Sequence, residues 1–194
     1  MFDHFTDEDH AIFMRAAQDA CANSHDPKTQ TGAVIVTPDR EIIGRGSNTL
    51  PSGRLTQEIK DNLCSNNFSN EFRYNMMMHA EPNSIFDALM NGRKTEGCAI
   101  YLPWYPCIDC AKNIARAGLK MMVHSTMHID YDDPQWGAGF RQAKGHFDRA
   151  GMRIVVFLPD GKEYKREEHM FGSIHYADFY KSEEFLKNHP QKTR

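Results

Sequence analysis

The chain has 194 residues, of which 40% are hydrophobic and 11% are aromatic, and its formal net charge is −3. This length suits one compact domain with a hydrophobic core. Proteins that hold a nucleic-acid polymer through its phosphates usually carry a basic excess, so the slightly acidic balance argues against a polymer partner and favours a small-molecule substrate.

The cysteines and the first residues indicate the cellular compartment. The chain has 5 cysteines, an odd number in a domain too large to need disulfide cross-links, so they do not indicate a disulfide framework. The opening Met1-Phe2-Asp3-His4 lacks the basic and apolar regions of a signal peptide, and no apolar run approaches membrane-spanning length. We therefore expect a cytoplasmic protein with no membrane partner.

The first part of the chain predicts a helix followed by a hairpin. Thr6 precedes three acidic residues, which is a helix N-cap pattern, and apolar residues then recur at helical spacing until Asp26. Residues 31–37 and 42–46 predict two strands. Residues 47–78 are polar and rich in Ser, Asn and Gly, which predicts a long irregular loop, and such loops often carry function.

From His79 onwards, predicted helices alternate with predicted strands. The helices are expected at 79–90, 107–117 and 138–150, and the strands at 97–102, 120–125 and 152–158. The order α-β-β-α-β-α-β-α-β predicts an α/β fold, a three-layer α/β/α sandwich with a mixed five-stranded sheet. We assign residues 1–160 to this domain and residues 161–194 to a C-terminal extension that packs on the domain or on a neighbouring subunit.

Two short segments carry residues typical of a metal site: His79-Ala80-Glu81 and Pro106-Cys107-Ile108-Asp109-Cys110. One imidazole and two thiolates give zinc three protein ligands and leave the fourth tetrahedral position open, which is typical of a catalytic site. Cys107 and Cys110 lie three apart in the first turn of a predicted helix. Both sulfurs can therefore reach one ion, and the helix dipole favours thiolates. The sequence predicts one Zn²⁺ per subunit, held by His79, Cys107 and Cys110.

Glu81 is expected to lie beside the metal, because it is too close in sequence to His79 to share its direction on a helix. There its carboxylate can take a proton from an attacking water and pass it to the group that leaves. A lone Cys-x-x-Cys could instead be a redox pair or half of a structural zinc site. A metal-stabilised binding protein without turnover has no use for this carboxylate, so Glu81 favours an enzyme.

The pattern H-x-E…P-C-x-x-C is the signature of zinc-dependent nucleobase deaminases. With it, the chain resembles the deoxycytidylate (dCMP) deaminases of the cytidine deaminase-like superfamily. The resemblance includes residues 24–36 and 44–53, the latter similar to the family's G-x-GYN-G-x-P-x-G loop, and it spans about residues 10–158. It implies hydrolytic deamination of a cytosine nucleotide, first dCMP to dUMP plus ammonia, by a homo-oligomer such as a dimer or hexamer.

The resemblance also implies where the substrate lies. The cytosine ring is expected against the backbone at Ala80, with Asn48 in the pocket and the Tyr105 carbonyl facing the amino group. A substrate phosphate needs a cation, and Arg54 and Arg73 are the candidates.

Other substrates stay open, because Ser47 and Thr49 stand where the family has Tyr and Gly. The alternatives are another small aminated ring, such as cytidine, deoxycytidine, guanine or a pterin, or a tRNA or single-strand editing deaminase. The composition argues against the editing enzyme, since strand binding relies on a positive groove. His124 is interpreted as a core or surface histidine, and Cys64 as a plain loop thiol rather than a ligand of a second zinc.

Overall fold

The computed structural model describes residues 2–26, 29–51, 56–57, 61, 75–126 and 129–158. Its helices and strands follow the predicted order, which is confirmed. They are α1 Asp7–Cys21, β1 Gly32–Val36, β2 Ile42–Ser47, α4 Ala80–Met90, β3 Ala99–Leu102, α5 Ile108–Arg116, β4 Met121–His124, α6 Gly137–Ala150 and β5 Arg153–Val156. The predicted extension at 161–194 lies outside the described residues.

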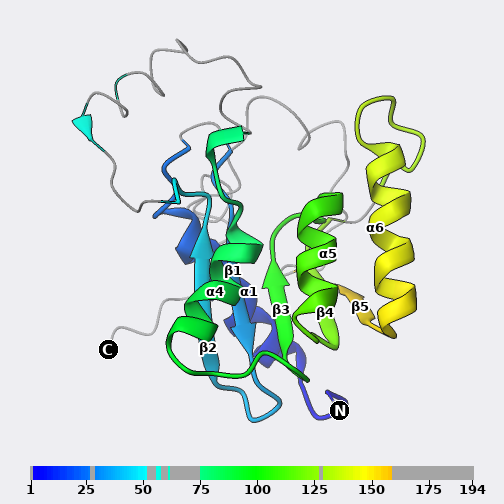
Figure 1. Cartoon of the computed structure of the whole chain (residues 1–194). Coiled ribbons are helices and arrows are strands. Elements are labelled where there is room, and N and C mark those ends of the chain that lie inside the picture. The colour runs from blue at the N-terminus through cyan, green and yellow to red at the C-terminus, as the bar shows by residue number, and fades with distance from the viewer. Residues whose placement is uncertain are drawn as a thin grey trace.

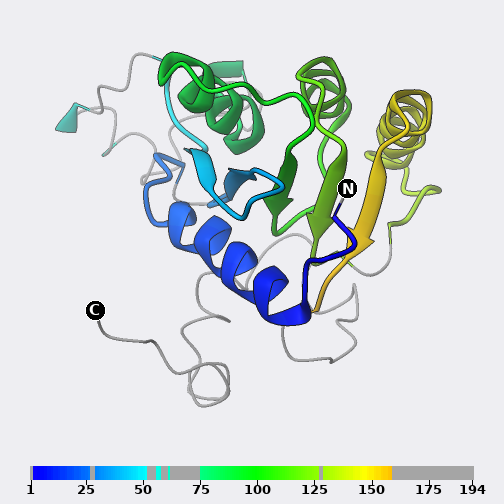
Figure 2. The ribbon, with the colours of Figure 1, turned by 90° about the horizontal axis from the view of Figure 1, so that it is seen from below.

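The strands form one five-stranded sheet in the order β2-β1-β3-β4-β5. β1 is antiparallel to both β2 and β3, whereas β3, β4 and β5 run parallel. Helix α1 covers one face of the sheet, and α4, α5 and α6 cover the other (Figure 1, Figure 2). The predicted three-layer sandwich with a mixed sheet is therefore confirmed. Within the described residues, no helix combines the length and apolar character needed to cross a membrane.

Two hydrophobic clusters fill the spaces on either side of the sheet. The three central strands β1, β3 and β4 are buried at every position, because helices cover both of their faces. The cluster beneath α4, α5 and α6 includes Ile35, Ile100, Ile114, Met122 and Phe147. The cluster beneath α1 includes Phe13, Met14, Val34, Tyr101 and Val123.

Helix α4 lies very close to β2 because two glycines of that strand face it. A Cβ atom on Gly44 would lie 2.2 Å from the Ser84 carbonyl oxygen, and one on Gly46 would lie 2.1 Å from the Ala80 carbonyl oxygen. Only glycine permits such a close approach of two backbones. The sequence of β2 therefore sets the position of the helix that follows His79.

The described residues of the predicted irregular loop at 47–78 include a β-bridge and two helical residues, so that prediction is wrong for these residues, and most of 52–74 lies outside the described residues. Thr49 and Met78 form an isolated antiparallel bridge, with N–H···O hydrogen bonds of 3.0 and 2.8 Å. Asn75 and Met76 are helical. The bridge joins the end of β2 to the start of α4, a contact between segments far apart in sequence that local patterning does not reveal.

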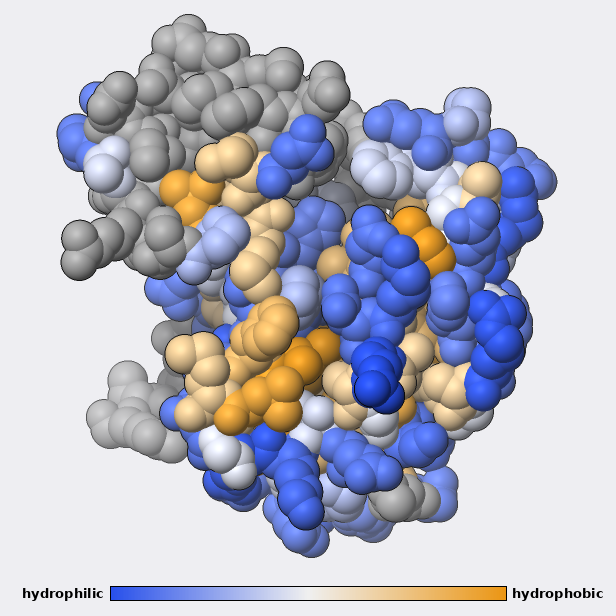
Figure 3. All heavy atoms as spheres, viewed as in Figure 1, coloured by the Kyte–Doolittle hydropathy of each residue, from blue (hydrophilic) through white to orange (hydrophobic). Residues whose placement is uncertain are grey.

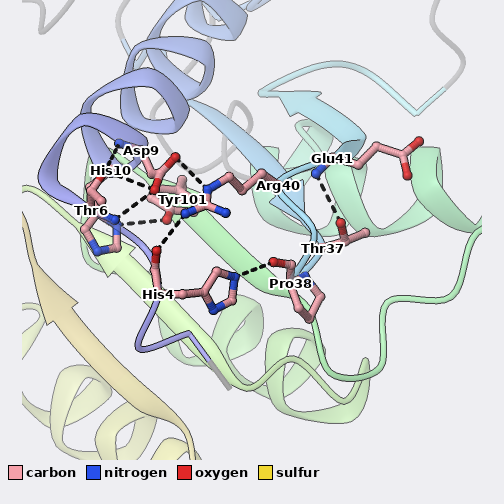
Figure 4. Close-up of polar contacts among 9 residues, drawn as sticks. All are labelled: His4, Thr6, Asp9, His10, Thr37, Pro38, Arg40, Glu41 and Tyr101. Atoms are coloured by element: carbon pink, nitrogen blue, oxygen red, sulfur yellow. Dashed lines mark hydrogen bonds and ion pairs between the residues drawn. The ribbon is translucent and has the colours of Figure 1, made fainter.

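Helix α1 is anchored at its start by a capping box and by Arg40 (Figure 4). The Thr6 hydroxyl accepts a hydrogen bond from the Asp9 amide, and the Asp9 carboxylate accepts one from the Thr6 amide. Arg40 Nε donates to Asp9 Oδ1 at 2.8 Å, and Arg40 Nη2 donates to the His4 carbonyl oxygen at 2.6 Å. The hydrogen bond from Arg40 lowers the pKa of Asp9 to about 2. These contacts join the N-terminal segment to the β1–β2 turn.

Candidate metal centre and active site

His79 and Cys107 occupy equivalent positions, the N-caps of α4 and α5. Both have extended backbone, and neither side chain makes a capping hydrogen bond, so both remain available to a ligand. Cys110 lies in the first turn of α5, on the buried side of that helix. Helices α4 and α5 pack against each other and begin at the same end of the sheet (Figure 1). The three side chains therefore meet there.

The donor atoms of His79, Cys107 and Cys110 all lie within 4.8 Å of one another. His79 Nδ1 is 3.3 Å from Cys110 Sγ and 3.6 Å from Cys107 Sγ. A tetrahedral zinc with Zn–N of about 2.0 Å and Zn–S of about 2.3 Å requires N···S separations of about 3.5 Å. The donor set and its spacing therefore fit Zn²⁺, with His79 offering Nδ1.

The contact between the two thiols shifts their pKa values in opposite directions. A hydrogen bond from Cys110 lowers the pKa of Cys107 to about 4, with a further contribution from His79. The same contact, together with burial, raises the pKa of Cys110. The hydrogen bond with Cys107 raises the pKa of His79. The pair thus loses its first proton at Cys107, and thiolates are the form that binds metal.

Glu81 is the second residue of α4 and is buried, with 6% of its surface exposed. Burial raises the pKa of its carboxyl group. Among the described residues, Glu81 Oε2 has no hydrogen-bond partner. A buried carboxyl group that has a raised pKa and an unsatisfied oxygen can hold a proton and release it again, as a general acid and base must.

Asn48 and Ala80 are in direct contact. Both are buried, and Asn48 Oδ1 accepts a hydrogen bond of 3.0 Å from the Ala80 amide. Asn48 Nδ2 donates to the Thr29 carbonyl oxygen at 2.8 Å. The side-chain amide of Asn48 is thereby fixed in one orientation beside the residue that links His79 to Glu81.

Tyr105 lies in the segment between β3 and α5, two residues before Cys107, and is buried. Its amide donates a 3.0 Å hydrogen bond to Thr126 Oγ1. The other two sequence-predicted substrate residues, Arg54 and Arg73, lie outside the described residues. The structure therefore places three of the five expected substrate residues, all of them beside or near the metal donors.

Asn83 supports the site, and the sequence analysis assigned it no role. Its Nδ2 lies 2.7 Å from the Ser47 carbonyl oxygen, 3.0 Å from Thr49 Oγ1 and 3.2 Å from the Met78 carbonyl oxygen. It thus ties α4 to the residues on both sides of Asn48. The signal in the sequence was its position, one helical turn after His79.

Comparisons with known proteins agree with this geometry. A family model described as "Cytidine and deoxycytidylate deaminase zinc-binding region" matches residues 7–126. The deoxycytidylate deaminase of Pongo abelii is 32% identical over 147 residues, which cover 76% of this chain and 78% of the relative. The deoxycytidylate deaminase of Mus musculus is 33% identical over 147 residues, which again cover 76% of this chain and 78% of the relative.

A solved structure shows the same fold. The crystal structure of dCMP deaminase from the cyanophage S-TIM5 in apo form has a TM-score of 0.58 and 23% sequence identity, covering 78% of this chain and 99% of that chain. Because the family model matches more than half of its length, the chain belongs to the cytidine and deoxycytidylate deaminase family.

Proposed function

We propose that the protein is a zinc-dependent hydrolytic deaminase that converts dCMP to dUMP and ammonia. The observation that carries this proposal is the buried carboxyl group of Glu81, whose Oε2 has no hydrogen-bond partner among the described residues, in the same site as one imidazole and two thiols spaced for a zinc ion. Relatives covered over most of their length are named deoxycytidylate deaminases, and the S-TIM5 enzyme has been crystallised in complex with dCMP and dUMP.

In this proposal His79 Nδ1, Cys107 Sγ and Cys110 Sγ hold one zinc ion per subunit. The bound ion supplies Lewis-acid activation of the attacking water. Cys107 and Cys110 would bind it as thiolates, and the positive end of the α5 dipole stabilises their negative charge.

Glu81 moves the protons. Its carboxylate accepts a proton from the attacking water as the water oxygen bonds to the ring carbon that bears the amino group. It delivers that proton to the adjacent ring nitrogen, and then carries a second proton from the new hydroxyl group to the amino group. The carbon–nitrogen bond breaks and ammonia leaves, so that water and dCMP give dUMP and ammonia. Burial of Glu81 raises its pKa and favours a carboxyl group that is protonated in mid-reaction.

Ala80, Asn48 and Tyr105 are proposed to bind the base. Ala80 and Asn48 are both buried, and the Ala80 amide donates a hydrogen bond to Asn48 Oδ1. The Tyr105 carbonyl would face the amino group of the base. Arg54 and Arg73 remain the proposed partners of the substrate phosphate. A small nucleotide, rather than a polymer, is consistent with the net charge of −3.

The test is ammonia release by the purified, zinc-loaded protein with dCMP, CMP, deoxycytidine, cytidine, dCTP, guanine and adenosine. We expect dCMP to give the highest kcat/KM, and the Glu81→Gln variant to bind zinc without turning over. Turnover of guanine or a nucleoside in preference to dCMP would replace the proposed substrate while keeping the chemistry. No turnover of any compound by zinc-loaded protein would overturn the proposal.

We also propose that the protein is a cytoplasmic homo-oligomer, a dimer or a hexamer, with residues 1–160 as the deaminase domain. Helix α4 exposes three large apolar side chains, Phe86, Leu89 and Met90, the last with 86% of its surface exposed. Apolar side chains gather over this helix in Figure 3. Contiguous exposed apolar groups mark interaction surfaces. Light scattering should give a multiple of the chain mass, and the double variant Leu89→Glu/Met90→Lys should reduce it.

A further inference from the structure

The segment that joins β3 to α5 has few backbone N–H groups that can donate hydrogen bonds. Pro103 and Pro106 lack an N–H group, so the chain between β3 and Cys107 offers only the amides of Trp104 and Tyr105. The Tyr105 amide donates to Thr126 Oγ1 at 3.0 Å, and the Pro103 carbonyl oxygen accepts from the Ser125 amide at 3.2 Å. The residues that follow β4 therefore hold this segment.

Thr126 is itself held by His124. The Thr126 amide donates to His124 Nδ1 at 3.2 Å, and His124 is completely buried at the end of β4. Because a backbone amide can only donate, Nδ1 must accept, which places the imidazole proton on Nε2. Burial lowers the pKa of His124 to about 4, so the ring stays neutral and keeps this tautomer at neutral pH.

His124 also contacts Tyr105 directly. Their rings meet edge to face, with centroids 5.3 Å apart and an interplanar angle of 80°. Phe140 and Phe147 pack against the same Tyr105 ring at 5.6 and 6.1 Å, also nearly perpendicular. The Tyr105 ring is thus fixed by aromatic edges, and its amide is fixed by one hydrogen bond that depends on His124 through Thr126.

We propose that His124 and Thr126 are positioning residues, which orient the Tyr105 backbone so that its carbonyl group faces the amino group of the substrate. This inference rests on the proposed function, which assigns that carbonyl to the substrate. Neither residue is expected to touch the substrate or the metal. A carbonyl group aimed at the leaving nitrogen matters most as the carbon–nitrogen bond breaks, so its misplacement should lower kcat more than it raises KM.

The matched pair Thr126→Val and Thr126→Ser tests the hydrogen bond to Tyr105. Valine keeps the shape of threonine but cannot accept from the Tyr105 amide, whereas serine retains the hydroxyl group. We expect Thr126→Val to lower kcat about 10-fold, with KM changed less than about threefold and zinc content unchanged, and Thr126→Ser to stay within about twofold of the parent protein. Equal kcat values for the two variants would overturn the proposal.

A second pair, His124→Asn and His124→Leu, tests the acceptor of Thr126. Asn can place Oδ1 near the position of Nδ1 and accept from the Thr126 amide, but leucine cannot. We expect the asparagine variant to retain more of kcat than the leucine variant. Thermal unfolding of both shows whether the leucine variant folds, and if it does not, the Thr126 pair decides the question.

Hydrogen exchange at the Tyr105 amide tests the positioning role independently of whether dCMP is the substrate. We expect exchange at Tyr105 to be about 10-fold faster in Thr126→Val than in the parent, and to be restored in Thr126→Ser. This result would hold even if another compound of the panel proved to be the substrate, and kcat would then be compared with that compound. Unchanged exchange in Thr126→Val would overturn the positioning role whatever the substrate.

Discussion

The two faces of the sheet bury polar groups in different ways. On the α1 face, His10 Nδ1 and the Tyr101 hydroxyl group lie 2.9 Å apart and satisfy each other, and Arg40 pairs with Asp9 at the edge. The neutral side-chain amide of the buried Gln18 in α1 has no hydrogen-bond partner among the described residues. On the face beneath α4 and α5, Glu81 Oε2 and His124 Nε2 have no hydrogen-bond partner among the described residues. Paired polar groups stabilise a fold, whereas burying an unpaired group costs stability, and the cost is greater for an ionisable group than for a neutral amide. The difference between the faces therefore lies in their titratable groups: His10 and Asp9 on the α1 face are paired and support the fold, whereas the opposite face leaves a carboxyl oxygen of Glu81 unpaired beside the metal donors.

The strongest test of this comparison replaces Glu81. We expect Glu81→Gln to lower kcat by about 10³-fold, because the general acid and base is lost. The melting temperature of the zinc-loaded protein should stay the same or rise, because the variant removes a carboxyl group that burial disfavours. Measurements of kcat, zinc content and thermal unfolding test the two expectations.

The control for Glu81 lies on the other face. Asp9→Asn removes the carboxylate that Arg40 and Thr6 hold. It should lower the melting temperature and leave kcat within about twofold of the parent, the opposite of the result for Glu81→Gln. A large loss of turnover in Asp9→Asn would break the division between the two faces.

Gly46→Ala should have the next largest effect. A Cβ at this position would lie 2.1 Å from the Ala80 carbonyl oxygen, so α4 must move away from β2 and take His79 with it. We expect a loss of about 3 kcal/mol in the free energy of unfolding and weaker zinc binding. Urea unfolding and metal titration measure the two effects.

Gly139→Ala is the matched control, because nothing lies within 4 Å of a Cβ there and the residue is in helix α6. Alanine in a helix interior is favoured over glycine, so this variant should gain about 0.5 kcal/mol and bind zinc as before. If Gly46→Ala were equally harmless, β2 would not set the position of α4.

The free energy of unfolding should depend on pH through His124. Burial lowers its folded-state pKa to about 4, whereas the unfolded value is about 6.5. The unfolded chain therefore binds the proton first as the pH falls, and the stability present above about pH 6.5 is lost towards about pH 4. Between about pH 7 and about pH 5 this amounts to about 2 kcal/mol. His124→Asn should reduce the loss by that amount in urea unfolding at the two pH values, and an unchanged loss would show that His124 is not the group responsible.

Local patterns in the sequence predicted the order of elements and the metal donors. The N-cap pattern at Thr6, the helical spacing of Cys107 and Cys110, and the apolar strands are all features of short segments. The fold class followed from their order.

The contacts that orient the site could not be predicted in this way. Asn83 has acceptors 36, 34 and 5 positions away, and Tyr105 finds its acceptor 21 positions away at Thr126. Such partners depend on which strands lie side by side, and a side-chain amide or hydroxyl group carries no local sign of its partner. His124 likewise read as an ordinary histidine, because its burial follows from the packing of Tyr105 against it.

The smallest expected effect on the free energy of unfolding is that of replacing Arg40, which lies on the α1 side of the sheet. Arg40→Ala should cost at most about 1 kcal/mol, because the guanidinium side chain is 42% exposed and water screens its pair with Asp9. The folded-state pKa of Asp9, about 2, lies below its usual value, so this contribution is present above about pH 4 and disappears as the pH falls towards about 2.

Arg40 has a φ of 66°, and Arg40→Gly should therefore lose less stability than Arg40→Ala while losing the same ion pair. Urea unfolding at about pH 7 compares the two variants, and kcat should be unchanged in both. A drop in kcat would mean that the β1–β2 turn communicates with the metal centre, and that the two faces do not act independently.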